Sequence, residues 1–217
     1  MQNLSAIKSI QMEWSNVISV IIAILVMIGL PLALRKRRKV GPQRKEELCQ
    51  HLQKIGVRAY LAQIRDDREK IGQTRSSGEK SMGIIELKDR NIDFINITGV
   101  ATQYGTHYFI NYLVRNLNMT EKRKLKKTRL VRRKSALLWG KVVGIEWKGD
   151  ESIAKSLNFD YGLENKLLHS ELKDSGGGIW IFPEPKHEYV RIRTAYSLPS
   201  PEAFETIGII ARYVKSW

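Results

Sequence analysis

The sequence predicts an α+β protein in which one N-terminal transmembrane helix precedes a cytoplasmic domain. We expect that domain to have a mostly antiparallel sheet packed against helices and to end in a capped amphipathic helix. Three observations predict this plan. An uncharged apolar run covers residues 17–34. Several short segments rich in β-branched residues follow in the middle of the chain. The last segment opens with Ser200-Pro201-Glu202, an N-cap followed by residues that favour the first helical turn.

The apolar run VISVIIAILVMIGLPLAL is long enough to be a membrane anchor, because about 20 apolar residues span a hydrocarbon core of roughly 30 Å. Five consecutive basic residues follow it: Arg35, Lys36, Arg37, Arg38 and Lys39. A cleaved signal peptide carries its positive charge before the apolar run instead. We therefore expect an uncleaved anchor over residues 14–34. By the positive-inside rule, residues 1–13 lie outside the cell membrane and the chain after the anchor lies in the cytoplasm.

The net charge of +15 on 217 residues is unevenly distributed. Residues 35–45 carry seven of the 37 Lys and Arg residues, and residues 122–134 carry nine, so the rest of the chain has 21 basic against 22 acidic residues. This pattern predicts two local contacts with anionic partners rather than a uniformly basic surface. The single cysteine, Cys49, excludes an intrachain disulfide and a cysteine-rich zinc site.

The segment after the anchor is predicted to be a basic linker over residues 35–43, which contains Gly41-Pro42. An amphipathic helix is expected over residues 44–73, because apolar residues recur there at spacings of three and four: Leu48, Leu52, Ile55, Ala59 and Ala62. Its apolar stripe needs a partner, which is either the following domain or a second copy of the chain. Residues 73–83 are expected to form a flexible link.

The cytoplasmic α+β domain is predicted over residues 84–217. Strands are expected at residues 84–87, 92–98, 107–115, 136–147, 179–182 and 189–196, the last two as a hairpin. Helices are expected at 150–157 and 160–172 and after Ser200. On one side of the strand at 136–147 we expect Leu137, Trp139, Val143, Ile145 and Trp147. Gly140 and Gly144 on the other side indicate a close approach by another group.

The basic tract at residues 118–134 has no convincing apolar face and is expected to be a loop. Its charged members are Lys122, Arg123, Lys124, Lys126, Lys127, Arg129, Arg132, Arg133 and Lys134. A solvated loop or a contact with an acidic partner is our first interpretation, and a membrane-surface contact is the second. Nucleic-acid binding ranks third, because the tract contains no aromatic residue on which a base would stack. For Arg35 to Lys39 we expect a topology role and contact with anionic lipid headgroups.

Alternation along the strand at 189–196 places Arg191 and Arg193 on one face, where two guanidinium groups are a candidate clamp for a phosphate or carboxylate. The favoured alternative is an exposed sheet face on which both arginines pair with nearby acids.

For catalysis the sequence offers no recognisable constellation. The four histidines have no metal-ligand spacing, and there is no phosphate loop, dinucleotide fingerprint or nucleophile elbow, so we expect no metal and no cofactor. The plan resembles that of many prokaryotic membrane proteins, a likeness of architecture alone.

The leading hypothesis is therefore a non-enzymatic, single-pass membrane protein whose domain is a protein-interaction or scaffold module, bound to another protein or to itself. The first alternative is a membrane-proximal enzyme or binder of an anionic ligand, with Arg191 and Arg193 as binders. Its candidate acid–base groups are His169, His187, Asp160 and Glu164. The second alternative is membrane-tethered nucleic-acid binding through Lys122 to Lys134.

Overall fold

The computed structural model describes residues 43–62, 67–71, 78–88, 90–119, 125–135, 142–173 and 178–217. The expected N-terminal segment 1–13, the anchor at 14–34 and the basic cluster Arg35 to Lys39 lie outside these residues. No helix within the described ranges is long and apolar enough to cross a membrane. Residues Arg44–Trp217 form one compact unit.

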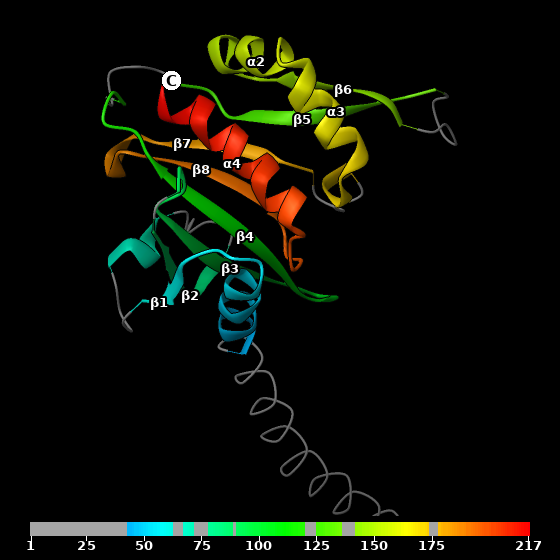
Figure 1. The fold of residues 1–217 in the computed structure, drawn as a ribbon. Helices are drawn as coiled ribbons and strands as arrows, with labels where there is room; N and C mark the ends of the chain where they lie inside the picture. The colour runs from blue at the N-terminus through cyan, green and yellow to red at the C-terminus, as the bar shows by residue number, and fades with distance from the viewer. Residues whose placement is uncertain are drawn as a thin grey trace, which may run out of the picture. The chain divides into compact units, whose positions relative to one another are not determined.

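An eight-stranded sheet is the framework of this unit, and every neighbouring pair of strands in it is antiparallel. The strand order is β1-β2-β3-β4-β8-β7-β5-β6. The bounds are β1 Ala59–Leu61, β2 Glu79–Leu87, β3 Phe94–Thr102, β4 Gly105–Arg115, β5 Thr128–Lys134, β6 Val142–Lys148, β7 Trp180–Glu184 and β8 Tyr189–Ala195. The predicted α+β class and antiparallel sheet are confirmed. The β7–β8 hairpin lies between β4 and β5, so it joins the first half of the sheet to the second (Figure 1).

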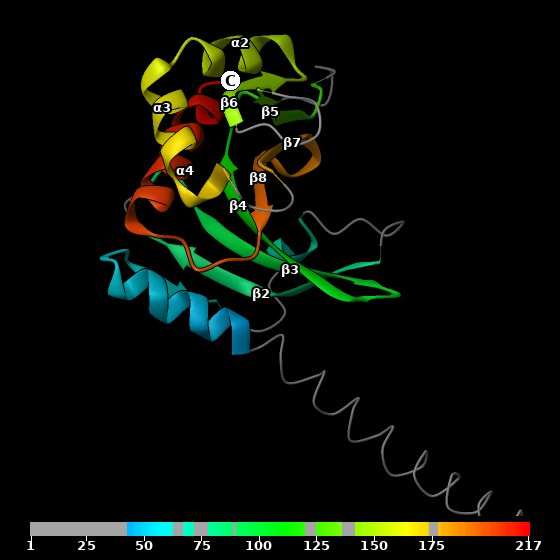
Figure 2. The same cartoon turned by 90° about the vertical axis from the view of Figure 1, so that its right-hand side faces the viewer.

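Helices cover one face of this sheet (Figure 2). They are the helix over residues 43–54, α2 (Glu151–Asn158), α3 (Tyr161–His169) and α4 (Pro201–Lys215). Short 3-10 turns are η1 (Asp67–Lys70), η3 (Glu171–Lys173) and η4 (Pro185–His187). Ser200 caps α4 as predicted, because its side chain accepts a hydrogen bond from the backbone N–H of Ala203.

The main core lies between the sheet and these helices. The predicted stripe of α4 is buried: Phe204, Ile207, Ile210, Ala211 and Val214. Phe204 meets Tyr112 of β4 edge to face, with ring centroids 6.3 Å apart. Fully burying one such side chain contributes about 1.5–3 kcal/mol to folding, so this contact helps to hold α4 against β4.

The predicted helix at 44–73 was wrong in its extent. The helix ends at residue 54, and β1 follows at Ala59–Leu61. Gly56 explains the end, since it has a left-handed φ of +80°, which glycine adopts without steric cost. Ala59, counted in the helical stripe, instead pairs with Leu87 of β2.

The start of the helix over residues 43–54 is fixed by stacking against the sheet. The Arg44 guanidinium lies 4.2 Å from the ring centroid of Tyr108 and 4.7 Å from that of Tyr196. The Tyr196 hydroxyl donates to the Arg44 carbonyl oxygen at 3.0 Å. Burial raises the pKa of Tyr196 to about 12, and the nearby Glu47 carboxylate adds to the rise.

The expectation of a loop at 118–134 was also wrong, because residues 128–134 form β5. Thr128 and Leu130 face the core and are buried, while Arg129 is exposed. The period-two alternation is therefore present in the sequence, but the basic composition conceals it.

In β6, Ile145 and Trp147 are buried as expected, whereas Val143 is 62% exposed. Leu137 and Trp139, the other two members of that prediction, lie outside the described residues. The register with β5 shifts at a bulge between Arg133 and Lys134. A bulge re-aims the side chains beyond it, so Val142 packs on the core in place of Val143. The expected flexible link at 73–83 was too long, since β2 begins at Glu79.

Candidate functional site

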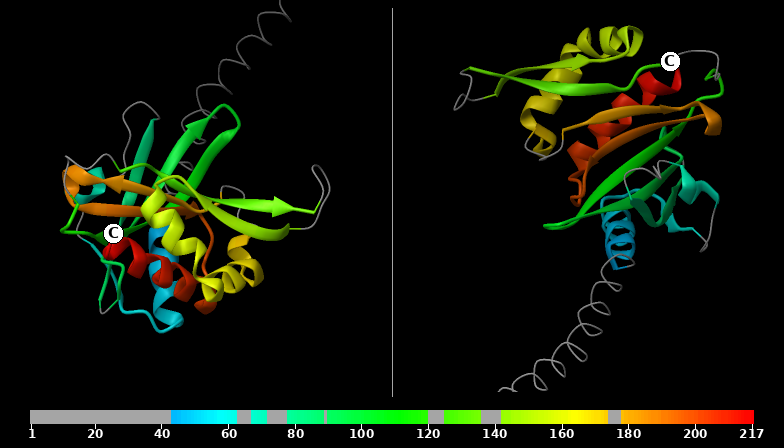
Figure 3. Two further views of the ribbon diagram at one scale, coloured as in Figure 1. Left: turned by 90° about the horizontal axis from the view of Figure 1, so that it is seen from above. Right: turned by 180° about the vertical axis from the view of Figure 1, so that it is seen from behind.

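The sheet face opposite the helices, here called the second face, carries Arg191 and Arg193. The strand registers place Asn111 of β4, Arg193 of β8, Trp180 of β7 and Arg129 of β5 in one cross-strand row. Figure 3 shows these four strands side by side. Side chains in one row of a sheet are direct neighbours, so the fold places residues from four strands side by side.

Arg193 is held in a buried polar network. Its Nη1 donates to Oε2 of Glu79 at 3.2 Å, and its guanidinium lies 3.7 Å from the ring centroid of Phe109. The other Glu79 oxygen accepts a hydrogen bond from the Thr98 hydroxyl at 2.5 Å, and Asn111 Nδ2 donates to that hydroxyl at 2.8 Å. Burial lowers the pKa of Arg193, while the Glu79 charge opposes that change.

Arg191 is 4% exposed, and each end of its guanidinium is occupied. Its Nε and Nη2 donate to Oε1 of Glu184 at 3.1 and 3.0 Å, and its Nη1 donates to Oδ1 of Asn111 at 3.2 Å. The guanidinium also lies 4.4 Å from the ring centroid of Phe182. Both arginines thus pair with acids, as the favoured alternative expects, but the pairs are buried rather than exposed. Each of the three Arg191 side-chain nitrogens therefore already has an acceptor within the protein.

Beside Arg193 the second face is hollowed. This aromatic hollow has a volume of about 250 Å³ and is lined by Phe109, Lys127, Gly178, Trp180, Phe182, Arg193, Thr194 and Ala195. The rings of Trp180 and Phe182 stack with centroids 6.1 Å apart and planes 18° apart. Lys127 Nζ lies 5.2 Å from the Trp180 ring centroid and the Arg129 guanidinium lies 5.5 Å from it. The hollow therefore combines three aromatic rings with cations.

The described part of the basic tract reaches this region. Lys126, Lys127, Arg129 and Arg133 are exposed, and Arg132 is partly buried. Lys122, Arg123 and Lys124 lie outside the described residues, as does the side chain of Lys134.

At Gly144 of β6 the predicted close approach is present. A Cβ there would lie 3.2 Å from Nη2 of Arg133. Gly140, the other glycine of that prediction, lies outside the described residues.

The candidate acid–base groups do not assemble around the arginines. Asp160, Glu164 and His169 belong to α3 or its cap, on the helix-covered face, so the sheet separates them from Arg191 and Arg193. Asp160 caps α3 through Leu163 N at 2.9 Å and accepts from the Tyr213 hydroxyl at 2.9 Å.

The hydrogen bond from Leu163 lowers the pKa of Asp160, and the bond from Tyr213 adds to the lowering. His169 Nδ1 lies 2.8 Å from the Asn165 carbonyl oxygen, and His187 is exposed in η4. Across the described ranges, no three His, Cys, Asp or Glu side chains are close enough to hold a metal ion.

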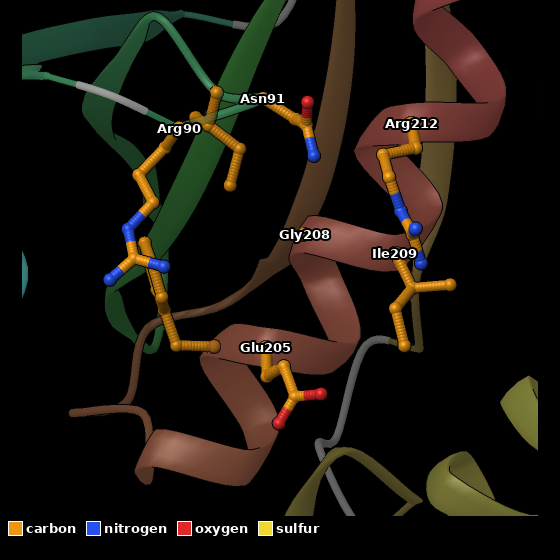
Figure 4. Close-up of a pocket in the computed structure, with 8 residues that line it drawn as sticks. Arg90, Asn91, Glu205, Gly208, Ile209 and Arg212 are labelled. Carbon is orange, nitrogen blue, oxygen red and sulfur yellow. The ribbon is translucent and has the colours of Figure 1, made fainter.

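A larger groove of about 550 Å³ runs beside α4 (Figure 4). Arg90 and Asn91, from the loop between β2 and β3, lie across it from Glu205, Gly208 and Arg212. The Glu205 carboxylate accepts from Lys166 Nζ at 2.9 Å, and this contact lowers its pKa. The walls carry charges of both signs and no nucleophile next to a base, so they form no recognisable catalytic arrangement.

The residues that sequence reasoning missed are Phe109, Trp180 and Phe182. Each lies on a predicted strand, and Trp180 and Phe182 share one face by alternation. Their proximity to the basic tract depends on β5 pairing with β7, through Thr128 with Ile181 and Arg129 with Trp180. That pairing was not predictable, because the tract was not assigned as a strand.

Comparison with known proteins finds no matching family model, no similar curated protein and no similar solved structure.

Proposed function

We propose that this protein is a single-pass membrane protein of the scaffold type, whose cytoplasmic domain recruits an anionic partner to the inner membrane surface through the second face. The apolar run at 17–34, with its five following basic residues, supports the anchor and the orientation. The aromatic hollow supports a binding role, and it is the observation on which the proposal depends.

The contacts of the charged residues favour binding over catalysis. Arg191 is already paired with Glu184 and hydrogen-bonded to Asn111, and Arg193 is paired with Glu79. Asp160 caps α3 and accepts a hydrogen bond from the Tyr213 hydroxyl. Lys127 and Arg129, by contrast, are exposed at the rim of the hollow, where each lies over the Trp180 ring. Exposed cations beside rings can turn toward an incoming anion at little cost in packing.

The test is chemical cross-linking in the native membrane, followed by purification of the full-length chain and identification of what is attached. One variant, Lys127→Glu with Arg129→Glu, reverses two charges beside the hollow. A matched variant, Lys155→Glu with Lys215→Glu, reverses two exposed charges on α2 and α4. We expect the first variant to lose a partner that the native chain and the matched variant both retain.

Equal recovery of the same partners with both variants would contradict the proposal, because the second face would then not be the binding surface. Recovery of no specific partner from the native chain would contradict it as well. A partner that disappears only with the α2 and α4 charges would assign binding to the helix-covered side instead.

A further inference from the structure

The second face brings together the two features that sequence-tolerant binding of single-stranded nucleic acid requires. Such proteins combine cations for the phosphates with aromatic rings on which bases stack. The basic tract supplies the cations and lacks rings, whereas β7 has the rings. Because β5 pairs with β7, Lys127 and Arg129 lie over Trp180, with Phe182 stacked beside it.

The size of the hollow limits what enters it. Pockets that enclose a whole small-molecule ligand have volumes of roughly 300–1,000 Å³, and this one has about 250 Å³. It suits one planar group at a time rather than a complete cofactor. The three rings that line it are Phe109, beneath the Arg193 guanidinium, and the stacked pair Trp180 and Phe182.

The charges continue away from the hollow along β5. Arg129 and Arg133 are exposed and lie on the same face of the strand. Lys148 of β6 is the cross-strand partner of Arg129. Successive same-face residues on a strand are about 6.6 Å apart, so Arg129 and Arg133 lie about 13 Å apart along β5, with Val131 between them. A chain of phosphates can therefore follow β5 while one base enters the hollow. Glu146 pairs with Lys148 at 3.3 Å and partly offsets this stripe.

We infer that the anionic partner is a single-stranded nucleic acid, with a base stacked in the aromatic hollow and flanking phosphates bound by Lys127, Arg129 and Arg133. The inference rests on the proposed function and names the class of partner. An acidic peptide would use the cations and leave the rings without a role. A duplex would keep its bases stacked internally and away from the rings. RNA and DNA both have bases and phosphates, so the experiment uses an oligonucleotide of each kind.

The test measures binding of the full-length chain, held in nanodiscs of neutral phosphatidylcholine, to fluorescent oligo-dT and oligo-U of about 15 nucleotides, a length within the range of known single-strand sites. A duplex of equal length and polyglutamate are the comparison ligands. Trp180→Leu removes the ring, and Trp180→Phe keeps one. Tyr161→Leu on α3 is the matched control, because Tyr161 is exposed and lies on the other side of the sheet.

We expect Trp180→Leu to weaken single-strand binding about 5- to 150-fold, the effect typical of removing one stacked base. Trp180→Phe should retain most of the affinity, and Tyr161→Leu should change nothing. Lys127→Gln with Arg129→Gln should reduce the slope of log K against log salt by about 0.7 for each phosphate that the variant no longer neutralises. Thermal unfolding of each variant, measured in parallel, distinguishes weaker binding from incomplete folding.

Equal affinity for duplex and single strand, or no effect of Trp180→Leu, would overturn the inference, since the rings would then have no part in binding. Tighter binding of polyglutamate would overturn it too, and would leave the proposed function intact with an acidic protein as partner. If no oligonucleotide binds while the cross-linking experiment still loses a protein with Lys127→Glu and Arg129→Glu, only the nucleic-acid inference fails.

Discussion

The pair Glu79 and Arg193 shows what alternation along one strand predicts and what it does not. Alternation places Arg191 and Arg193 on one face, and the structure agrees. It does not predict that Glu79, 114 positions away, accepts a hydrogen bond from the Arg193 guanidinium. Nor does it predict that Thr98 and Asn111 complete the shell around that carboxylate. These hydrogen-bond partners lie on other strands. Their proximity depends on the order of the strands in the sheet, which the residue pattern of a single strand does not determine.

Breaking this pair should be costly. A single substitution, Glu79→Gln or Arg193→Met, leaves one charged group buried without its counter-charge, so we expect each to lower the free energy of unfolding by about 3 kcal/mol. The double variant Glu79→Gln with Arg193→Met should lose less than the sum of the two single losses. Urea unfolding of the full-length chain, followed by circular dichroism, measures this. The exposed pair Lys166 and Glu205 is the control, and Lys166→Gln should have little effect. Additive losses at Glu79 and Arg193 would show that the pair is not coupled.

At the scale of elements, the sequence predicts well wherever one apolar pattern dominates. The α4 helix, with its Ser200 cap and buried stripe, and the β7–β8 hairpin follow from local signals. Prediction fails where two signals compete. The helical spacing of apolar residues before Gly56 continues by chance into β1. In β5, the many basic residues concealed the alternation that places Thr128 and Leu130 in the core. The candidate site lies beside β5, so that one wrong assignment also concealed the site.

Two glycines test how the elements are joined. Gly149 has a φ of +146°, and a Cβ there would lie 2.2 Å from the Lys127 carbonyl oxygen. The backbone between β6 and α2 thus touches the start of β5. We expect Gly149→Ala to destabilise the fold by more than about 1 kcal/mol, from strain and from this clash.

The comparison variant is Gly208→Ala. Gly208 lies within α4, and a Cβ there would meet nothing within 4 Å. Alanine should stabilise α4 by about 0.5–1 kcal/mol, because it costs less backbone entropy than glycine in a helix. Thermal unfolding of both variants measures the two effects, and effects of equal sign would contradict this account of how β6, α2 and β5 meet.

At the scale of the whole molecule, the proposals depend on which side of the membrane the domain occupies. Phosphates and bases are plentiful in the cytoplasm, so the nucleic-acid inference requires the orientation that the positive-inside rule predicts for Arg35 to Lys39. Cys49 makes this orientation easy to measure. Its side chain is buried, and burial raises the pKa of its thiol. A thiol that is buried and protonated reacts slowly with maleimides, so the native chain gives a low background.

Labelling of introduced cysteines by a membrane-impermeant maleimide therefore decides the orientation. We expect Ser5→Cys, before the anchor, to react in intact cells, and Lys155→Cys, on an exposed position of α2, to react only after permeabilisation. The native chain is the control and should react only after denaturation, when Cys49 is exposed. The reverse pattern would place the domain outside the cell and remove the nucleic-acid inference with it. Labelling of both positions in intact cells would contradict the anchor itself, because a chain with a single span has its two ends on opposite sides of the membrane.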